Sequence, residues 1–132
     1  MSNVYGPRQN PHGEAGVIAI FCAAAAEGRP VTVFGDGTQT RDFVYVEDVA
    51  EAFAAAGSSA EQGAINVSTG VETSLTELAA ALGLETMRQP GRLGEIRRSS
   101  LDPGAAARRL GWTARTPLAE GLRRTLDSLT PA

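Results

Sequence analysis

Two arginines and a carboxylate are the side chains of this sequence whose types and spacing could do chemistry. Arg41 follows the glycine-rich segment 35–37, and Arg92 precedes Glu95 by three positions. Glycines let a backbone approach a ligand closely, and a guanidinium fork matches two oxygens of a phosphate. A carboxylate accepts hydrogen bonds from a sugar diol. Together these residues supply the chemistry that binding a nucleotide requires.

A polar amide and a helix start could extend such a site. Asn3 lies at the end of an expected strand, which is where open α/β sheets bind ligands. The backbone amides near Gly16 and Val17, at an expected helix N-terminus, could add contacts to an anion.

Each of these residues also has a purely structural interpretation. Asn3 could bond only to the backbone of its own turn, and Arg41 could pair with Asp42 or Asp48 at the surface. Arg92 and Glu95 could form one solvated ion pair, which contributes only about 0–1 kcal/mol. Residue types and spacing therefore leave a ligand site and a set of surface ion pairs both open.

The elements that must position these residues alternate between strand and helix. Apolar runs predict strands over 31–34, 43–46 and 64–67, besides the strand end at Asn3. The continuously apolar run 43–46 is typical of a strand buried on both faces. Periodic apolar residues and start signals predict helices that begin near Glu14, Asp48, Ser74, Asp102 and Thr116. The sequence therefore predicts an α/β fold.

Capping signals define the expected helix starts. Asp48 is expected to cap its helix with its carboxylate, and Ser74 with Glu77 matches a capping box. Asp102 and Thr116 each precede a proline, a residue that favours the first helical position. The expected buried faces are Val49, Ala52, Phe53 and Ala56 in the second helix and Leu118, Leu122, Leu126 and Leu129 in the last.

Length and composition indicate one globular domain over residues 1–132. The chain is 42% apolar and 20% charged, which suffices for a buried core. Its longest apolar run, 17–26, is shorter than the roughly 20 residues of a membrane span, and no secretory signal follows Met1. The single Cys22 excludes an intrachain disulfide and, with the single His12, a cysteine–histidine zinc site. We therefore expect a cytoplasmic protein without metal or membrane span.

The charged residues are unusual because every basic residue is an arginine. The chain has 12 basic residues and no lysine, so no mechanism that needs a lysine amine is complete in it. The formal net charge is −3, and only the segment 85–132 is mildly basic. That balance is too weak to indicate nucleic-acid binding.

Several motifs follow one another in a specific order along the chain. They are 3–9 (NVYGPRQ), 35–50 (GDGTQTRDFVYVEDVA), 66–70 (NVSTG), 94–102 and 110–118. Together they resemble the extended short-chain dehydrogenase/reductases that act on nucleotide sugars, above all the UDP-glucose 4-epimerases and their relatives. The resemblance implies that the α/β fold is the C-terminal, substrate-binding part of a Rossmann-type enzyme, without the N-terminal βαβ units that bind NAD.

The resemblance implies a role in binding a UDP-sugar for the residues singled out above. Arg41 and Arg92 would clamp the diphosphate, and Glu95 would hold the ribose hydroxyls. Asn3 would bond to the sugar–diphosphate end of the substrate, and Val17 would add a backbone contact near the helix start.

It also implies two contacts made by the backbone. The strand Thr32, Val33 and Phe34 would offer its backbone groups to the edge of the uracil. Ser2 would touch the nicotinamide side of the cofactor.

The catalytic parts of the resembled family have no counterpart in this sequence. The family binds NAD through a Gly-x-x-Gly-x-x-Gly loop and oxidises C4 of the sugar with a Tyr-x-x-x-Lys pair, whereas Tyr5 and Tyr45 lack a lysine four residues on. We therefore expect no catalytic residue and no bound NAD in this chain alone, which would depend on a missing N-terminal half and on the homodimer usual in the family. Two functions stay open: the UDP-sugar-binding portion of an epimerase or of a related 4,6-dehydratase or decarboxylase, and a non-catalytic nucleotide-sugar-binding or docking module.

Overall fold

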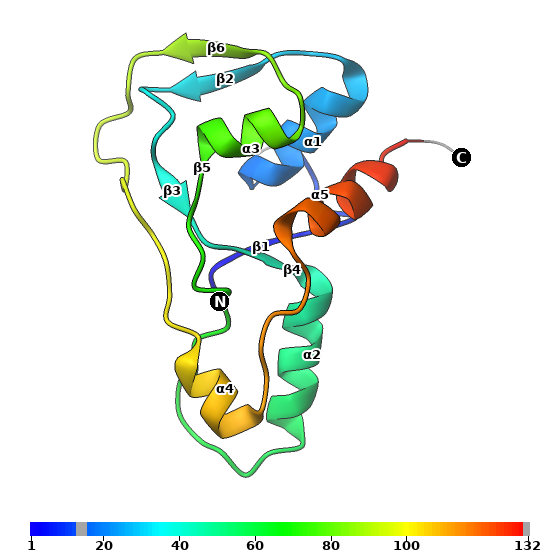
Figure 1. Ribbon diagram of the computed structural model, residues 1–132, viewed down its shortest axis with the longest axis vertical. Coiled ribbons are helices and arrows are strands. Elements are labelled where there is room, and N and C mark those ends of the chain that lie inside the picture. Colours follow the sequence, from blue (N-terminus) through cyan, green and yellow to red (C-terminus); the bar gives the residue numbers. More distant parts are fainter. Residues whose placement is uncertain (13–15, 131–132) are drawn as a thin grey trace.

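Strands and helices are interspersed along the chain in the computed structural model, which describes residues 1–12 and 16–130 (Figure 1). The strands are β1 (Asn3–Tyr5), β2 (Val31–Phe34), β3 (Thr40–Arg41), β4 (Phe43–Tyr45), β5 (Thr73–Ser74) and β6 (Thr86–Gln89). The helices are α1 (Val17–Glu27), α2 (Val46–Gly57), α3 (Leu75–Ala81), α4 (Gly104–Leu110) and α5 (Leu118–Asp127). This order confirms the predicted α/β class.

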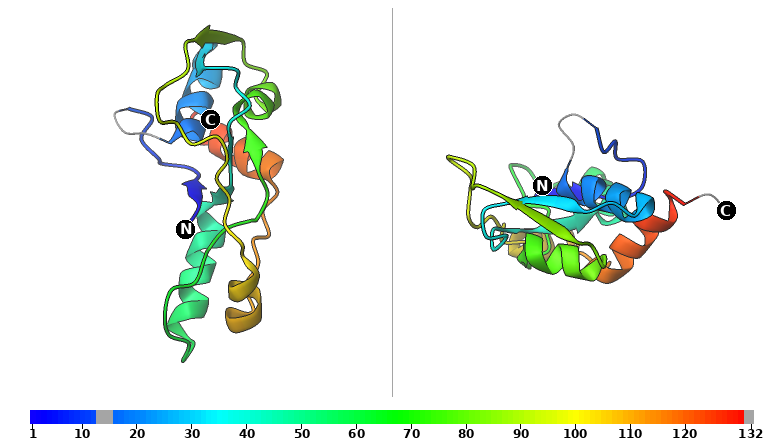
Figure 2. Two further views of the ribbon diagram at one scale, coloured as in Figure 1. Left: turned by 90° about the vertical axis from the view of Figure 1, so that its left-hand side faces the viewer. Right: turned by 90° about the horizontal axis from the view of Figure 1, so that it is seen from above.

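Two parallel strand pairs lie at different positions along the long axis of the molecule (Figure 1). β1 pairs with β4, with Val4 opposite Val44, and β2 pairs with β6, with Val33 opposite Arg88. The β2–β6 pair lies at one end, α2 and α4 lie at the other, and the β1–β4 pair lies between them (Figure 1). Helices α1 and α3 lie to either side of β2 and β6 when the molecule is seen along this axis (Figure 2).

Strand β4 contributes to both hydrophobic cores. Phe43 and Tyr45 belong to the core built with α1, β2, α3 and α5, whereas Val44 belongs to the core built with α2 and α4. Successive side chains of a strand point to opposite faces, so a fully buried strand must be apolar throughout. The prediction of a strand buried on both faces is confirmed over 43–45, and Val46 already belongs to α2.

The predicted cap at Asp48 is wrong. Helix α2 begins two residues earlier, with Tyr45 in the capping position and Asp48 buried in the first turn. The Asp48 carboxylate accepts hydrogen bonds from the backbone N–H (3.0 Å) and the hydroxyl (3.2 Å) of Thr116. The indole of Trp112 also donates to the Asp48 carbonyl, at 2.9 Å. The Asp48 carboxylate therefore bonds to a residue far along the chain and does not cap its own helix.

Two of the expected buried faces are only partly correct. In α2, Val49 and Ala52 are buried, whereas the Phe53 side chain is 59% exposed and Ala56 is also exposed. In α5, Leu122 is buried, Leu118 and Leu126 are half-buried, and Leu129, which lies beyond the helix, is exposed. Each helix touches its core along a narrower stripe than the sequence pattern predicts, because few elements cover it.

Other expected boundaries shift by a few residues. The capping box of Ser74 and Glu77 is confirmed at the start of α3. Helices α4 and α5 begin one residue after their prolines, and α1 begins at Val17, with Glu14 outside the described residues. The segment 64–67 is not a strand, although Ser2 donates a backbone hydrogen bond to Val67 at 3.0 Å.

Strand β6 has no counterpart in the expectations from sequence. Its four residues, Thr86–Gln89, are exposed, so no apolar pattern marks them. Within 1–12 and 16–130, no helix combines the length and apolar character that crossing a membrane requires, and no cluster of metal-ligating side chains occurs.

Candidate functional site

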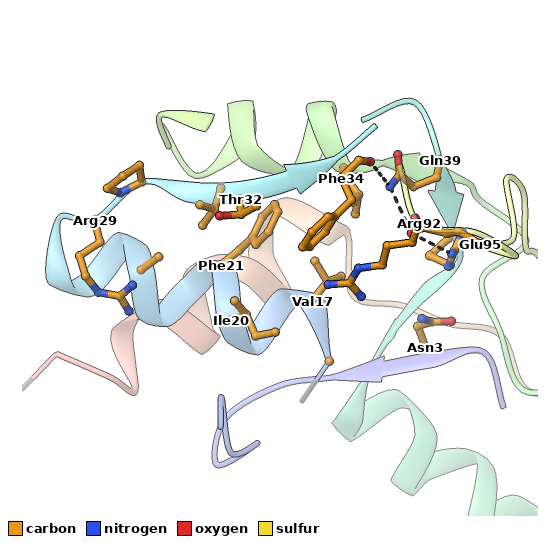
Figure 3. A pocket seen from close by; sticks show the side chains of 16 residues that line it. Asn3, Val17, Ile20, Phe21, Arg29, Thr32, Phe34, Gln39, Arg92 and Glu95 are labelled. Carbon is orange, nitrogen blue, oxygen red and sulfur yellow. Dashed lines mark hydrogen bonds and ion pairs between the residues drawn. The ribbon is translucent and has the colours of Figure 1, made fainter. Parts of the chain in front are cut away.

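A pocket of about 530 Å³ lies between α1 and β2 (Figure 3). Arg92 and Glu95 lie at the end near β3, Arg29 lies at the opposite end, and the side chains of Phe21 and Ile20 between them are apolar. The residues expected from the sequence that line this α1–β2 pocket are Asn3, Val17, Thr32, Phe34, Arg41, Arg92 and Glu95. Segments more than 90 positions apart in sequence therefore meet in one place.

Arg41 reaches the pocket from β3. One guanidinium nitrogen donates to the carbonyl of Thr40 at 2.7 Å, and another lies 3.9 Å from Oε1 of Glu95. The Arg41 side chain is 19% exposed, so its charge is only partly screened by water. The alternative pairing with Asp42 does not occur, because that carboxylate faces other partners.

Arg92 stacks on an aromatic ring instead of pairing with Glu95. Its guanidinium carbon lies 3.7 Å from the centroid of the Phe34 ring. Stacking on a ring leaves the N–H groups of a guanidinium free in its plane and limits its rotamers. The structure thus presents Arg92 to the pocket as an oriented donor.

Gln39 is a pocket residue that the sequence analysis missed. Its side chain is 2% exposed, and its amide donates to the Phe34 carbonyl at 3.1 Å and to Glu95 Oε1 at 3.2 Å (Figure 3). The only signal in the sequence is its place two residues before Arg41, where side chains of a strand share a face.

A buried carboxylate next to Arg41 ties three segments together. Asp42 is 1% exposed, and it accepts hydrogen bonds from the hydroxyls of Ser2 (3.2 Å), Thr69 (2.7 Å) and Ser100 (3.3 Å). The backbone N–H groups of Thr69 and Gly70 donate to it at 3.0 and 2.9 Å. Because this carboxylate holds the N-terminus, the 69–70 turn and the 100–101 segment, it fixes the frame on which Arg41 lies.

Two ion pairs fasten the segment that follows Glu95. Arg98 donates two hydrogen bonds to Glu72, at 2.7 and 3.0 Å, and Thr40 donates a third, so the pKa of Glu72 falls to about 2. Arg97 pairs with Asp36 at 3.2 Å; hydrogen bonds from Thr38 and Arg97 lower the pKa of that carboxyl. The segment that carries Arg92 and Glu95 is therefore tied to the strands below it.

Two expected residues do not line the α1–β2 pocket. The Val33 side chain is buried in the core, so only the backbone of that residue could serve a ligand. Ser2 lines a neighbouring cavity of about 360 Å³ that shares Asn3, Gly16 and Val17 with the first. The hydroxyl and backbone N–H of Ser2 are both engaged, by Asp42 and Val67.

The sequence model of the NAD dependent epimerase/dehydratase family matches residues 1–68, which are just over half of the chain. The chain belongs to this family. It is 52% identical to the UDP-glucose 4-epimerase of Mycolicibacterium smegmatis over 133 residues, which cover 96% of this chain and 42% of that protein. Relatives of this family member also include dehydratases and a decarboxylase of nucleotide sugars.

Solved structures agree with this assignment. The UDP-glucose 4-epimerase of Thermotoga maritima, solved with UDP-glucose, superposes with a TM-score of 0.90 at 41% identity, covering 96% of this chain and 43% of that one. The enzyme of Thermus thermophilus, solved with NAD, gives a TM-score of 0.83 at 43% identity, covering 96% and 44%. The chain thus spans about two fifths of the length of the relatives it matches.

The described residues do not form a dinucleotide site by themselves. No glycine loop of the Gly-x-x-Gly-x-x-Gly type follows a strand in 1–12 or 16–130, and the hydroxyl hydrogen and the backbone N–H of Ser2 are already donated to Asp42 and Val67. These described residues therefore do not fit NAD by themselves.

Proposed function

We propose that this family member is the UDP-sugar-binding portion of an NAD-dependent nucleotide-sugar 4-epimerase. The observation that carries the proposal is the convergence of Arg41, Arg92 and Glu95 at one end of the α1–β2 pocket. Two guanidinium groups and one carboxylate match the diphosphate and the ribose of a UDP-sugar.

The two arginines would anchor the diphosphate. Arg41 is held by Thr40 and Arg92 by Phe34, so both guanidinium groups are oriented before a ligand arrives. A hydrogen bond to a charged group contributes about 1.5–3 kcal/mol, and less entropy is lost when the donor is already placed. In an epimerase this anchor would hold the UDP still while the sugar presents its other face.

The free edge of β2 would recognise the base. Val31 and Gly35 donate their N–H groups to Glu85 and Gln89 of the β6 side. Residues alternate in a parallel strand, so the N–H and C=O of Thr32 point to the opposite edge. An amide N–H beside a carbonyl is the arrangement that pairs with the imide edge of uracil. Val17 of α1 lines the same pocket, so it would lie on the other side of the ligand.

The sugar and the cofactor would lie beyond the diphosphate. Asn3 lines both the α1–β2 pocket and the adjoining cavity that holds Ser2, so it stands where a ligand would pass from one to the other. The relatives solved with UDP-glucose and with NAD are more than twice the length of this chain. The NAD site and the catalytic pair would therefore correspond to the part of those relatives that this chain does not match. That part would also determine whether the reaction is an epimerisation, a dehydration or a decarboxylation.

The experiment is a calorimetric titration of the 132-residue chain with UDP. We expect binding in the wild type and a loss of about tenfold in affinity in Arg41→Ala and in Arg92→Ala. Arg108→Ala, which removes the same charge from α4 at the far end of the molecule, should leave the affinity unchanged. Absence of binding in the wild type, or equal losses in all three variants, would overturn the proposal.

A second candidate is a module that binds a nucleotide sugar without turning it over. It is favoured by the lysine-free sequence, since the Tyr-x-x-x-Lys pair cannot be formed from these residues. The purified chain with UDP-glucose and NAD tests the premise that both candidates share, which is that these residues alone do not turn the sugar over. We expect binding and no UDP-galactose; turnover would show that the catalytic groups lie within these 132 residues.

A further inference from the structure

A buried amide lies behind the charged end of the α1–β2 pocket. Gln39 uses both hydrogens of its amide nitrogen, one on the Phe34 carbonyl and one on Glu95 Oε1. It therefore connects the end of β2 to the carboxylate that faces the ligand.

The orientation of this amide is set in one sense only. Turning the group over would place its oxygen against the Phe34 carbonyl and the Glu95 carboxylate, two acceptors that cannot donate to it. The amide must keep its nitrogen toward Glu95, so it also fixes which carboxylate oxygen is used.

The amide oxygen of Gln39 has no such role in the fold. It is fully buried and has no hydrogen-bond donor among residues 1–12 and 16–130. An unpaired buried acceptor costs stability, so the fold gains nothing from this oxygen. Polar groups that cost the fold stability are commonest at functional sites.

The hydrogen bond to Gln39 also holds Glu95 back from Arg41. Oε1 of Glu95 lies 3.2 Å from the amide nitrogen but 3.9 Å from the guanidinium, which is at the limit of an ion pair. Without the amide, the carboxylate would be free to close onto Arg41. Its second oxygen, Oε2, takes part in no described hydrogen bond and is left for a ligand.

We propose that Gln39 is a positioning residue that aims the Glu95 carboxylate at the ribose hydroxyls of the bound nucleotide. The inference rests on the proposed function, because it takes a ribonucleotide as the ligand. Gln39 itself makes no contact with the ribose in this scheme; it sets how strongly the pocket prefers a ribose over a sugar without hydroxyls.

The test compares two ligands on one set of variants. UDP and 2′,3′-dideoxy-UDP are titrated calorimetrically into the wild type, Gln39→Met, Glu95→Gln and the double variant. The wild type should prefer UDP by about tenfold or more, and Gln39→Met should lose most of that preference. In the Glu95→Gln background, Gln39→Met should cause little further loss, since the two residues act as one unit.

Melting temperatures separate positioning from folding. Gln39→Met removes the unpaired oxygen and also the hydrogen bonds to the Phe34 carbonyl and to Glu95, so its melting temperature shows whether the variant is folded at the temperature of the titration. Gln62→Met, the same replacement at an exposed glutamine, should change neither the melting temperature nor the ligand preference. A Gln39→Met variant that loses affinity for both ligands equally, or that keeps the full preference for UDP, would overturn the inference.

The two proposals fail in different ways. No binding of UDP by the wild type overturns both. Binding of UDP that needs Arg41 but is indifferent to Gln39 overturns only the positioning role.

Discussion

The Arg92 guanidinium lies face-on to the Phe34 ring, with its central carbon 3.7 Å from the ring centroid. Phe34 ends β2, and Arg92 lies in the connection after β6, so this contact joins two segments whose strands are paired. Within residues 1–12 and 16–130 the Arg92 head group takes part in no hydrogen bond or ion pair, so the Phe34 ring is the group that orients the guanidinium.

Replacing Phe34 should therefore weaken UDP binding through Arg92. A cation–π contact contributes about 0.5–2 kcal/mol, so we expect Phe34→Leu to lower the affinity for UDP about fivefold. Phe53→Leu is the matched control, because Phe53 is exposed on α2 away from the pocket. Calorimetry with UDP gives the answer, and an unchanged affinity in Phe34→Leu would show that the ring does not orient Arg92.

Asp42 should be the carboxylate on which stability depends most. Its removal in Asp42→Ala leaves the donors of Ser2, Thr69, Gly70 and Ser100 without an acceptor. We expect the free energy of unfolding to fall by about 3 kcal/mol or more in urea titrations. Asp127→Ala, which removes an exposed partner of Arg123, should change it by less than about 0.5 kcal/mol. A loss below about 1 kcal/mol for Asp42→Ala would contradict the central role of this carboxylate.

Gly121 allows α5 to approach β1 closely. A Cβ at this position would lie 1.9 Å from the hydroxyl oxygen of Tyr5. Gly121→Ala should therefore lower the free energy of unfolding by about 1–3 kcal/mol, since a buried ring and a helix would both have to shift. Gly57→Ala near the end of α2 meets no atom within 4 Å and should leave the stability unchanged or raise it. Equal unfolding curves for the two variants would refute this account.

The ion pair of Glu72 and Arg98 should stabilise the fold at neutral pH and lose its effect in acid. The pKa of Glu72 is about 2 in the folded state because Arg98 and Thr40 donate hydrogen bonds to its carboxylate. A carboxyl whose pKa is lowered by folding adds stability above its unfolded pKa, and that stability is lost as the pH falls through the folded value. The stability difference between the wild type and Glu72→Gln should therefore be full at pH 6 and shrink between about pH 4.5 and pH 2.

Chemical unfolding at several pH values measures that difference. Glu51→Gln, an exposed change of the same kind on α2, serves as the control. A Glu72→Gln difference that is constant from neutral to acid pH would show that the ion pair does not contribute to folding.

The sequence by itself determined the features that depend on neighbouring residues. The capping box of Ser74 and Glu77 and the strand at 31–34 follow from side chains within a few positions of one another. The ordered motifs also identified the family and the pocket residues Arg41, Arg92 and Glu95. Such motifs can be recognised without coordinates, because each is a specific run of residue types at a fixed place in the sequence.

Only the tertiary structure decided what the polar side chains bond to. The sequence predicts that Asp48 caps its helix, but its carboxylate bonds to Thr116, 68 positions away. The place of Gln39 two residues before Arg41 does not reveal what its side chain bonds to, since its partner Glu95 lies 56 positions away. Strand β6 is exposed throughout and has no alternating apolar pattern, and it becomes a strand because the backbone of β2 lies beside it. A hydrogen bond depends on distance in space and not along the chain, so these partners are fixed only when the whole chain has folded.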